Sequence, residues 1–301
     1  MVKTSSLRIT SQTLSFVVIN LGFLGALYTG IPLAIFSCNY LKFRIFDCFL
    51  YVIQDGLATG SQGGTLYLYM LAEFLAIFLV MALLFGTAWC GWICPLGYVQ
   101  DLFSKGRAIA GIGYFKVPAR IQRHVKLIKY LFLAAVVIIS LGIALPNIRE
   151  TRLRNDLYLP LCQICPAKAL FLYLQIWVGI LPPTTDVPLL SMAVLPLFLI
   201  GTIMIRRAWC IICPNLAALS FFHKLNAISL FRRKERCTKC GTCVRVCSMN
   251  APNDALHGDV SRPECIRCFQ CIESCPADKS RSSHFFRRKI SESKFPRLSK
   301  R

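Results

Sequence analysis

Long apolar stretches alternate with basic loops over the first two thirds of the chain. Four of them, residues 14–36, 65–86, 127–145 and 188–205, approach the roughly 20 residues that a helix needs to cross a bilayer. A fifth, residues 169–181, is too short to cross and ends before two consecutive prolines. The pattern predicts an α-helical membrane protein with four transmembrane helices, in which the fifth stretch forms a re-entrant or interfacial helix.

The basic residues are distributed unevenly between the loops. Of the 35 Lys and Arg residues, 28 lie before the first stretch, between the second and third, or after the fourth. Loops rich in Lys and Arg stay in the cytoplasm, so we expect a multi-pass protein of a bacterial or archaeal inner (cytoplasmic) membrane with both termini cytoplasmic. The net charge of +21 then reflects topology and contact with the lipid bilayer. No nucleic-acid partner is expected, because no recognition motif accompanies the charge.

Two runs of cysteines follow Arg206, where the composition turns polar. Each run has the spacing of two-cluster bacterial ferredoxins, in which the fourth cysteine of one run binds the cluster of the other. Zinc takes only four ligands and would leave two cysteines of each run unused. The spacing predicts one [4Fe-4S] cluster on Cys237, Cys240, Cys243 and Cys275 and a second on Cys265, Cys268, Cys271 and Cys247.

Four further cysteines form two similar pairs, each preceded by Trp and followed by Pro. We call Cys90, Cys94, Cys210 and Cys213 the paired set. Both pairs follow a predicted span on the same side of the membrane and together supply the four thiolates of a third [4Fe-4S] cluster. Zinc ligation and burial as small apolar residues are the alternatives.

The remaining four cysteines lie in loops predicted on the outer side of the membrane. We call Cys38, Cys48, Cys162 and Cys165 the loop set. One interpretation is that they supply the ligands of a fourth cluster on the outer face. The alternative is that, in an oxidising compartment, they form disulfides such as Cys38–Cys48 or a redox-active Cys162–Cys165 pair.

Together, four spans, the paired set and a terminal two-cluster ferredoxin resemble the NapH family of membrane iron–sulfur subunits, over about residues 10–280. The resemblance implies quinol dehydrogenation linked to a periplasmic nitrate reductase, with quinone as the mobile substrate. Two features depart from the family pattern. Cys210 and Cys213 are separated by two residues where three are common, and the loop set has no counterpart.

Quinol oxidation also needs a proton acceptor, because a quinol gives up two protons with its two electrons. Glu73 is the only acid inside a predicted span and should face the bundle or a cavity, since a carboxylate is costly in lipid. It is either the catalytic group that exchanges protons with quinone or a neutral acid hydrogen-bonded between helices.

These observations divide the chain into a membrane domain (residues 1–228), a ferredoxin domain (229–280) and a basic, disordered tail (281–301). We interpret it as a quinol-dehydrogenase-type oxidoreductase subunit of an anaerobic respiratory chain. It would pass electrons from the quinone pool to a partner iron–sulfur or cytochrome subunit. Two alternatives remain: a cluster-bearing reductase or assembly factor for a respiratory metalloenzyme, and a conduit from a cytoplasmic reductant to an acceptor on the outer face.

Overall fold

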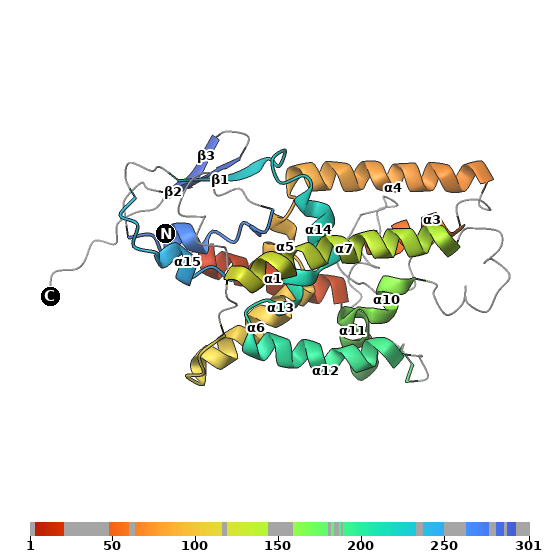
Figure 1. Ribbon diagram of the computed structural model, residues 1–301, viewed down its shortest axis with the longest axis horizontal. Coiled ribbons are helices and arrows are strands. Elements are labelled where there is room, and N and C mark those ends of the chain that lie inside the picture. The colour runs from red at the N-terminus through yellow and green to blue at the C-terminus, as the bar shows by residue number, and fades with distance from the viewer. Residues whose placement is uncertain are drawn as a thin grey trace.

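The computed structural model describes residues 4–20, 48–59, 64–115, 119–143, 159–179, 182–183, 187, 189–232, 237–249, 263–276, 281–285 and 288–292. These ranges are mainly helical (Figure 1). The first helices are α1 (Thr4–Asn20), α3 (Phe49–Thr59), α4 (Gly64–Leu84), α5 (Ala88–Trp92) and α6 (Pro95–Ile109). They are followed by α7 (Ala119–Ile143), α10 (Pro160–Ile164), α11 (Pro166–Trp177) and α12 (Leu189–Met204). The last are α13 (Ala208–Ile212), α14 (Pro214–Ser220), α15 (Thr242–Arg245) and α16 (Gln270–Glu273).

The longer helices enclose a core rich in aromatic and sulfur-containing side chains. Helix α7 packs against α3, α13 and α14, while α12 packs against α11 and α13. The ring of Phe49 stacks on that of Phe78 with 3.4 Å between the ring centroids, and Phe222 meets Phe78 edge-on. Two of the short helices, α5 and α13, lie where the long ones meet (Figure 1).

A small antiparallel sheet joins the two ends of the ferredoxin region. Its strands β1 (Ile228–Arg232), β2 (Arg281–Phe285) and β3 (Arg288–Glu292) lie in the order β1-β2-β3. Strand β1 pairs with β2 from Ile228 opposite Phe285 to Arg232 opposite Arg281. Two strands therefore occupy a segment for which the sequence predicts a disordered tail. Residues 293–301 of that tail lie outside the described ranges.

The prediction of four transmembrane helices is wrong for the part of the chain that the structure describes. In these ranges no helix has both the length and the apolar character that a membrane crossing requires. Helix α1 ends at Asn20, and α12 has only 16 residues. The first half of α7 carries Arg120, Arg123, Lys126 and Lys129, which leaves an apolar stretch shorter than the roughly 20 residues required. Residues 21–36 of the first predicted span are not described.

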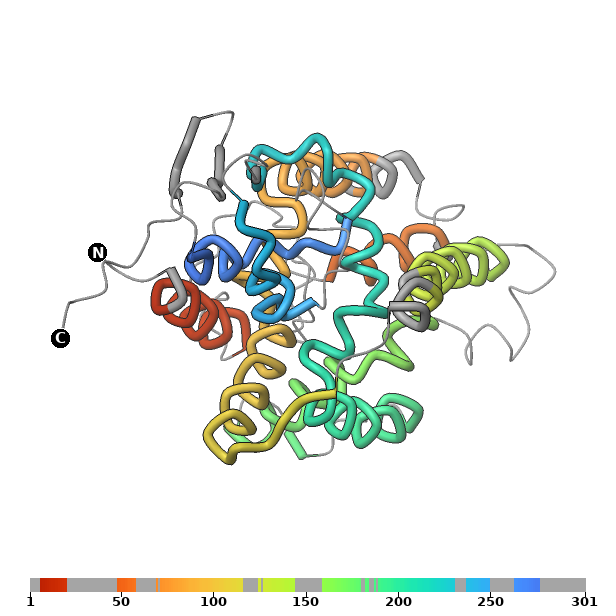
Figure 2. The backbone as a smooth tube through the Cα atoms, turned by 60° about the vertical axis from the view of Figure 1, so that its left-hand side comes forward, coloured from red at the N-terminus to blue at the C-terminus, as the bar shows by residue number. Residues whose placement is uncertain are grey.

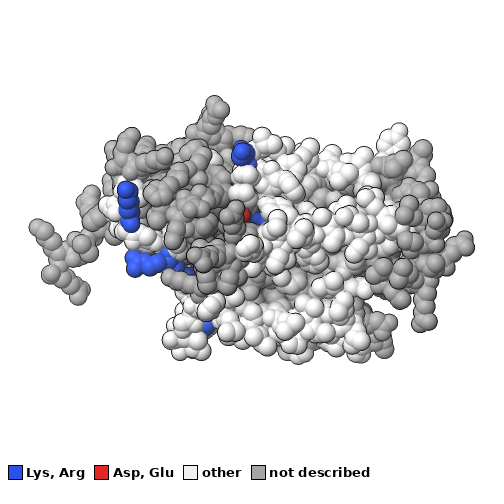
Figure 3. All heavy atoms as spheres, viewed as in Figure 1, with Lys and Arg blue, Asp and Glu red and all other residues white. Residues whose placement is uncertain are grey.

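On the face shown in Figure 3, the charged side chains that are visible gather toward one end. In Figure 3 the visible Lys and Arg side chains lie at the left-hand end and near the centre, whereas the right-hand part of the described surface carries almost only uncharged residues. Several large apolar side chains of the described helices are exposed, including Ile138 on α7 at 67%, Leu197 on α12 at 69% and Trp177 on α11 at 85%.

Candidate iron–sulfur sites

Each of the three Cys-Pro pairs joins a five-residue helix to a longer one. Cys94, Cys165 and Cys213 are the N-caps of α6, α11 and α14, and a proline follows in the first turn of each helix. Their backbone angles nearly coincide, with φ of −57°, −69° and −65° and ψ of 118°, 118° and 122°. Proline suits this position because the first N–H of a helix has no intrahelical partner. The other cysteine of each pair lies in the five-residue helix: Cys90 in α5, Cys162 in α10 and Cys210 in α13.

Backbone N–H groups at the start of each longer helix face the capping sulfur. They lower the pKa of that thiol, although burial has the larger effect and raises the pKa of Cys94 to about 11 and that of Cys165 to about 12. Such N–H groups carry partial positive charge and suit a sulfur atom that becomes negative when it binds iron. The donors are Leu96 and Gly97 for Cys94, Ala167 and Lys168 for Cys165, and Leu216 for Cys213.

The paired set comes together inside the core. Cys90 and Cys210 are buried in one apolar cluster, with Cys94 and Cys213 packed against it. Burial raises the pKa of Cys90 most, and the three other thiols of the set raise it further, so all four sulfurs are neighbours. Two segments more than a hundred residues apart in sequence thus contribute to one sulfur-rich site.

The paired set supplies four thiols, which are the ligands of an iron–sulfur cluster. In the described ranges no three His, Cys, Asp or Glu side chains are grouped so that they could hold a single metal ion. A [4Fe-4S] cluster takes four thiolates, each on a different iron, and therefore needs sulfurs that surround a larger volume. No disulfide joins cysteines within the described ranges.

A buried arginine links the paired set to a carboxylate. Arg207, fully buried at the N-cap of α13, donates two hydrogen bonds to Asp101 at 2.9 and 2.6 Å and a third to the carbonyl of Cys90 at 2.8 Å. Burial alone would raise the pKa of Asp101, but Arg207 and a second ion pair, with Arg8, hold it well below its usual range. The guanidinium also lowers the pKa of Cys210, against the larger effect of burial.

A second cation, Lys129, also lies near the paired set. The ammonium group of Lys129 on α7 is buried and lies 4.8 Å from the centre of the Tyr130 ring. Burial lowers its pKa, while Glu264 and the thiols of Cys213 and Cys90 act in the opposite direction. Sequence reasoning missed the role of both cations, because nothing in the spacing of Lys129 and Arg207 relates them to the cysteines.

The two ferredoxin runs have the same local backbone. The residue before the second cysteine has positive φ in both runs, 54° at Lys239 and 50° at Arg267. The residue after that cysteine also has positive φ, 71° at Gly241 and 59° at Phe269, and caps a four-residue helix. In each run the N–H of Lys239 or Arg267 donates to the sulfur of the first cysteine, as expected for two equivalent cluster-binding loops.

The second ferredoxin run packs directly against α5. Thr87 donates to the carbonyl of Cys265 at 2.7 Å, and the indole of Trp92 donates to the carbonyl of Arg267 at 3.0 Å. A side chain at Gly91 would meet the carbonyl oxygen of Ile266 at 2.3 Å, so only glycine permits this approach. Cys247 and Cys268 pack against the apolar cluster that contains Cys90 and Cys210. Helix α1 also lies beside α16 (Figure 2).

Two members of the loop set, Cys48 and Cys165, lie beside the paired set, not across a membrane from it as the predicted topology requires. Cys165, Cys94 and Cys213 pack against one apolar cluster, and Asn215 contacts the sulfur of Cys48 at 3.6 Å. The thiols of Cys48 and Cys94 raise the pKa of Cys165, after the larger effect of burial. Of the other two members, Cys162 lies in α10 and Cys38 lies outside the described residues.

Glu73 does not face the other helices as the sequence predicts. It lies exposed on α4. In Figures 1 and 2, α4 lies on the opposite side of the core from α11, the helix that follows Cys165. The part of Glu73 in quinone protonation stays a prediction.

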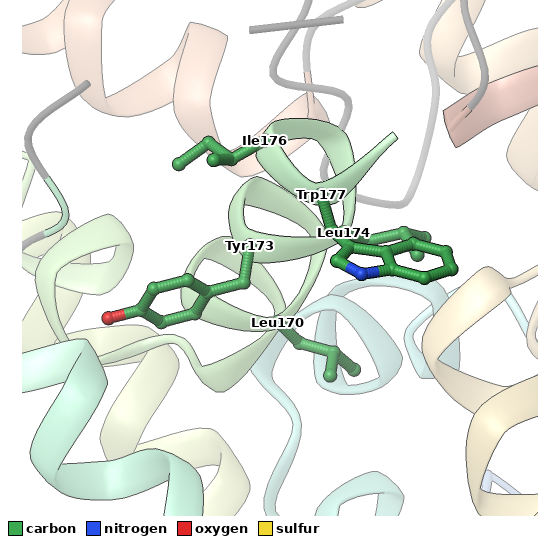
Figure 4. Close-up of a pocket in the computed structure, with 5 residues that line it drawn as sticks. All are labelled: Leu170, Tyr173, Leu174, Ile176 and Trp177. Atoms are coloured by element: carbon green, nitrogen blue, oxygen red, sulfur yellow. The ribbon is translucent and has the colours of Figure 1, made fainter. Parts of the chain in front are cut away.

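An open apolar groove of about 590 Å³ lies on α11, the helix that begins after Cys165. Tyr173 lies eight residues beyond Cys165, which corresponds to about 12 Å along a helix. Figure 4 shows how the side chains spread around this helix. The groove is lined by Leu170, Tyr173, Leu174, Ile176 and Trp177.

Comparison with known families assigns iron–sulfur binding to two parts of the chain. A family described as "4Fe-4S binding domain" matches residues 68–113 and 187–236, which contain the paired set. A "4Fe-4S dicluster domain" matches residues 229–276, which contain both ferredoxin runs. Neither match reaches Cys48, Cys162 or Cys165. No solved structure matches the chain.

Curated relatives cover most of the chain. YccM of Escherichia coli is 29% identical over 67% of the chain, which spans only 52% of that relative. An uncharacterized protein of Methanocaldococcus jannaschii is 27% identical, with 80% of the chain and 88% of the relative covered. The ferredoxin-type protein NapH of Escherichia coli is 25% identical, with 80% and 77% covered. The chain is therefore an iron–sulfur electron-transfer protein related to the NapH ferredoxin-type proteins, which confirms the resemblance indicated by its cysteine pattern.

Proposed function

We propose that this protein oxidises a quinol at the apolar groove on α11 and passes the electrons to a partner iron–sulfur or cytochrome protein at its ferredoxin end. The observation that carries the proposal is the contact between successive cysteine sites. Cys165, at the start of the groove helix, lies beside Cys94 and Cys213. Cys90 and Cys210 in turn share an apolar cluster with Cys268 of the ferredoxin.

In this proposal the cysteines hold the clusters and the surrounding residues control their environment. When bound, the clusters take up electrons singly, so that conversion of one quinol to quinone delivers two electrons to them in turn and two protons to water. Arg207 and Lys129 place positive charge beside the paired set. Tight packing around Cys90 and Cys210, which are 8% and 7% exposed, excludes water from that site.

The exposed apolar residues support a location at a lipid surface. Quinols are lipophilic, and the groove on α11 lies in the part of the molecule where α7 and α12 also expose large apolar side chains. A patch of this kind marks a surface that contacts lipid or another protein. We place the groove at the lipid surface, where a quinol reaches it directly.

The same contacts also support electron flow in the opposite direction. A reductant at the ferredoxin end would then reduce quinone at the groove. Electrons would leave the ferredoxin end, as they do in the conduit interpretation of the sequence, which has an acceptor on the outer face. The two directions share every cysteine site and differ in the reaction that starts them, so one experiment distinguishes them.

A quinol-oxidation assay tests this proposal. Purified protein with its clusters oxidised is mixed with a short-chain quinol under anaerobic conditions, and bleaching of the iron–sulfur absorbance is followed. We expect quinol to reduce the clusters, and Trp177→Ala to slow this reaction about tenfold because it removes a wall of the groove. Ile109→Ala, at an equally exposed apolar residue on α6, is the matched control and should react normally.

Dithionite should reduce both variants as fast as the unaltered protein, which shows that their clusters are intact. If quinol leaves the clusters oxidised but reduced clusters pass electrons to quinone, the conduit direction holds. If neither reaction occurs, quinone is not the substrate and the proposal fails.

A further inference from the structure

Two of the three Cys-Pro junctions match one another position by position. Residues with left-handed backbone, Leu159 (φ 55°) and Arg207 (φ 50°), are the N-caps of α10 and α13. In each case a cysteine follows three residues later, a capping cysteine three residues after that, and then a proline. The junction at Cys210 and Cys213 lies within the region matched to a 4Fe-4S binding family, whereas the junction at Cys162 and Cys165 lies outside it.

A left-handed conformation is costly for a non-glycine residue and persists only where the surrounding structure holds it. At Leu159 the surroundings provide this support. The N–H of Leu161, two residues on, donates to the side chain of Gln54 on α3 at 2.9 Å. Both Gln54 and Leu161 are buried, at 1% and 5% exposure. The contact fixes α10 against the helix that begins directly after Cys48.

A third thiol reaches this junction from the start of α3. Cys48 packs against the core near Cys94 and Cys213, and Asn215 on α14 contacts its sulfur at 3.6 Å. Cys48 and Cys165 are also close enough to influence one another electrostatically. Segments at α3 and α11 thus bring the thiols of Cys48 and Cys165 near one another, and the N–H groups of Ala167 and Lys168 face the second of them. Cys162 lies in α10 at the position that Cys210 has in α13.

We propose that Cys48, Cys162 and Cys165 bind a further iron–sulfur cluster directly beside the paired set. The proposal extends the proposed function, because this cluster lies between the paired set and the groove on α11. Three thiolates from this site supply three of the four that a cubane takes. In this proposal the cluster is separate from those of the paired set and the ferredoxin, and its three cysteines lie outside the segments matched by the families.

Iron and acid-labile sulfide content test this site without an activity assay. With two ferredoxin clusters, one on the paired set and one here, the full-length protein purified anaerobically should contain about 16 irons, at four per cubane. The triple variant Cys48→Ser/Cys162→Ser/Cys165→Ser should contain about 12 and keep the electron paramagnetic resonance signals of the ferredoxin clusters. Ile164→Ser, in the same short helix, is the control and should keep about 16. Equal iron content in the triple variant and the unaltered protein overturns the proposal.

Anaerobic alkylation of the unaltered protein, read by mass spectrometry, keeps the test valid if the triple variant fails to fold. We expect the three thiols to be protected until the iron is chelated and then to react. Reaction before chelation, or a Cys162–Cys165 disulfide in the purified protein, contradicts the proposal. If a cluster binds at this site but quinol does not reduce the protein, the cluster site is supported and only quinol as the electron donor is rejected.

Discussion

Arg207 shows how one side chain links charge, fold and chemistry. Its guanidinium forms two hydrogen bonds to Asp101 and one to the backbone of Cys90, so it connects α13, α6 and α5 around the paired set. Loss of one partner from a buried ion pair costs about 3–5 kcal/mol, because the other charge stays buried without compensation. The same positive charge favours the more negative, reduced state of a nearby cluster.

Removal of this charge should make one cluster harder to reduce. We expect Arg207→Met to lower the midpoint potential of the paired-set cluster by at least about 59 mV, which corresponds to about 1.4 kcal/mol for one electron. Arg207→Lys keeps the charge but not the two-pronged hydrogen bonding, and should keep most of the potential. A redox titration followed by electron paramagnetic resonance measures both.

Arg206→Met is the matched control for charge. Arg206 is next in sequence but lies over the Tyr114 ring at 4.2 Å. Its loss should leave the potential within a few tens of millivolts of that of the unaltered protein, on the order of the screened interaction expected at a surface. Equal shifts in Arg206→Met and Arg207→Met would show that Arg207 has no specific effect.

At the scale of helices, the Cys-Pro junction is the repeated unit of this protein. A short helix presents one cysteine, the capping cysteine follows, and proline starts the next helix in a fixed direction. The ferredoxin then docks on the first of these short helices through backbone carbonyls. This docking depends on the absence of a side chain at Gly91.

A methyl group at Gly91 should separate the ferredoxin from α5. Gly91→Ala places the Cβ atom 2.3 Å from the carbonyl oxygen of Ile266, and overpacking of this kind costs about 1–3 kcal/mol. We expect a lower thermal midpoint and faster proteolysis between residues 233 and 280. Circular dichroism and limited proteolysis of the iron-loaded protein measure these effects.

Gly106→Ala provides the opposite control. Gly106 lies in α6, and a Cβ atom at this position would meet no other atom within 4 Å, so alanine should stabilise the helix by up to about 1 kcal/mol. Similar behaviour of the two variants would show that the ferredoxin does not need close contact at Gly91.

At the scale of the whole molecule, the proposed function assigns different roles to the ferredoxin end and to the apolar surface of α7, α11 and α12. In that proposal the apolar surface contacts lipid and a lipophilic substrate, whereas the ferredoxin end contacts a redox partner.

The apolar surface should bind lipid vesicles independently of salt. We expect the protein to float with zwitterionic phosphatidylcholine vesicles in a density gradient, even at about 1 M salt, where the screening length is about 3 Å. Ile138→Lys/Leu197→Lys should reduce the floating fraction severalfold, because two exposed apolar residues become charged. Leu7→Lys on α1 is the control for a comparable change near the ferredoxin end. Release of the protein by salt would show that the contact is electrostatic instead.

The sequence alone determined the chemistry of this protein. Cysteine spacing is local, so the Cys-x2-Cys runs and the Cys-Pro pairs indicate iron–sulfur binding without knowledge of the fold. The family matches assign iron–sulfur binding to the segments that contain the ferredoxin runs and the paired set. For the residues that the structure describes, the prediction of four spans was wrong because an apolar stretch can reflect either burial in a core or contact with lipid. Residues such as Phe78 and Phe198 are apolar because they pack in a core.

Only the tertiary structure decided which sites are neighbours. The predicted topology separates Cys165 from Cys94 by a bilayer, whereas packing of α11 against α12 places both beside one apolar cluster. The positions of Arg207 and Lys129 beside the paired set depend on long-range contacts in the same way. Such contacts arise from the packing of distant segments, and no local spacing in the chain encodes them.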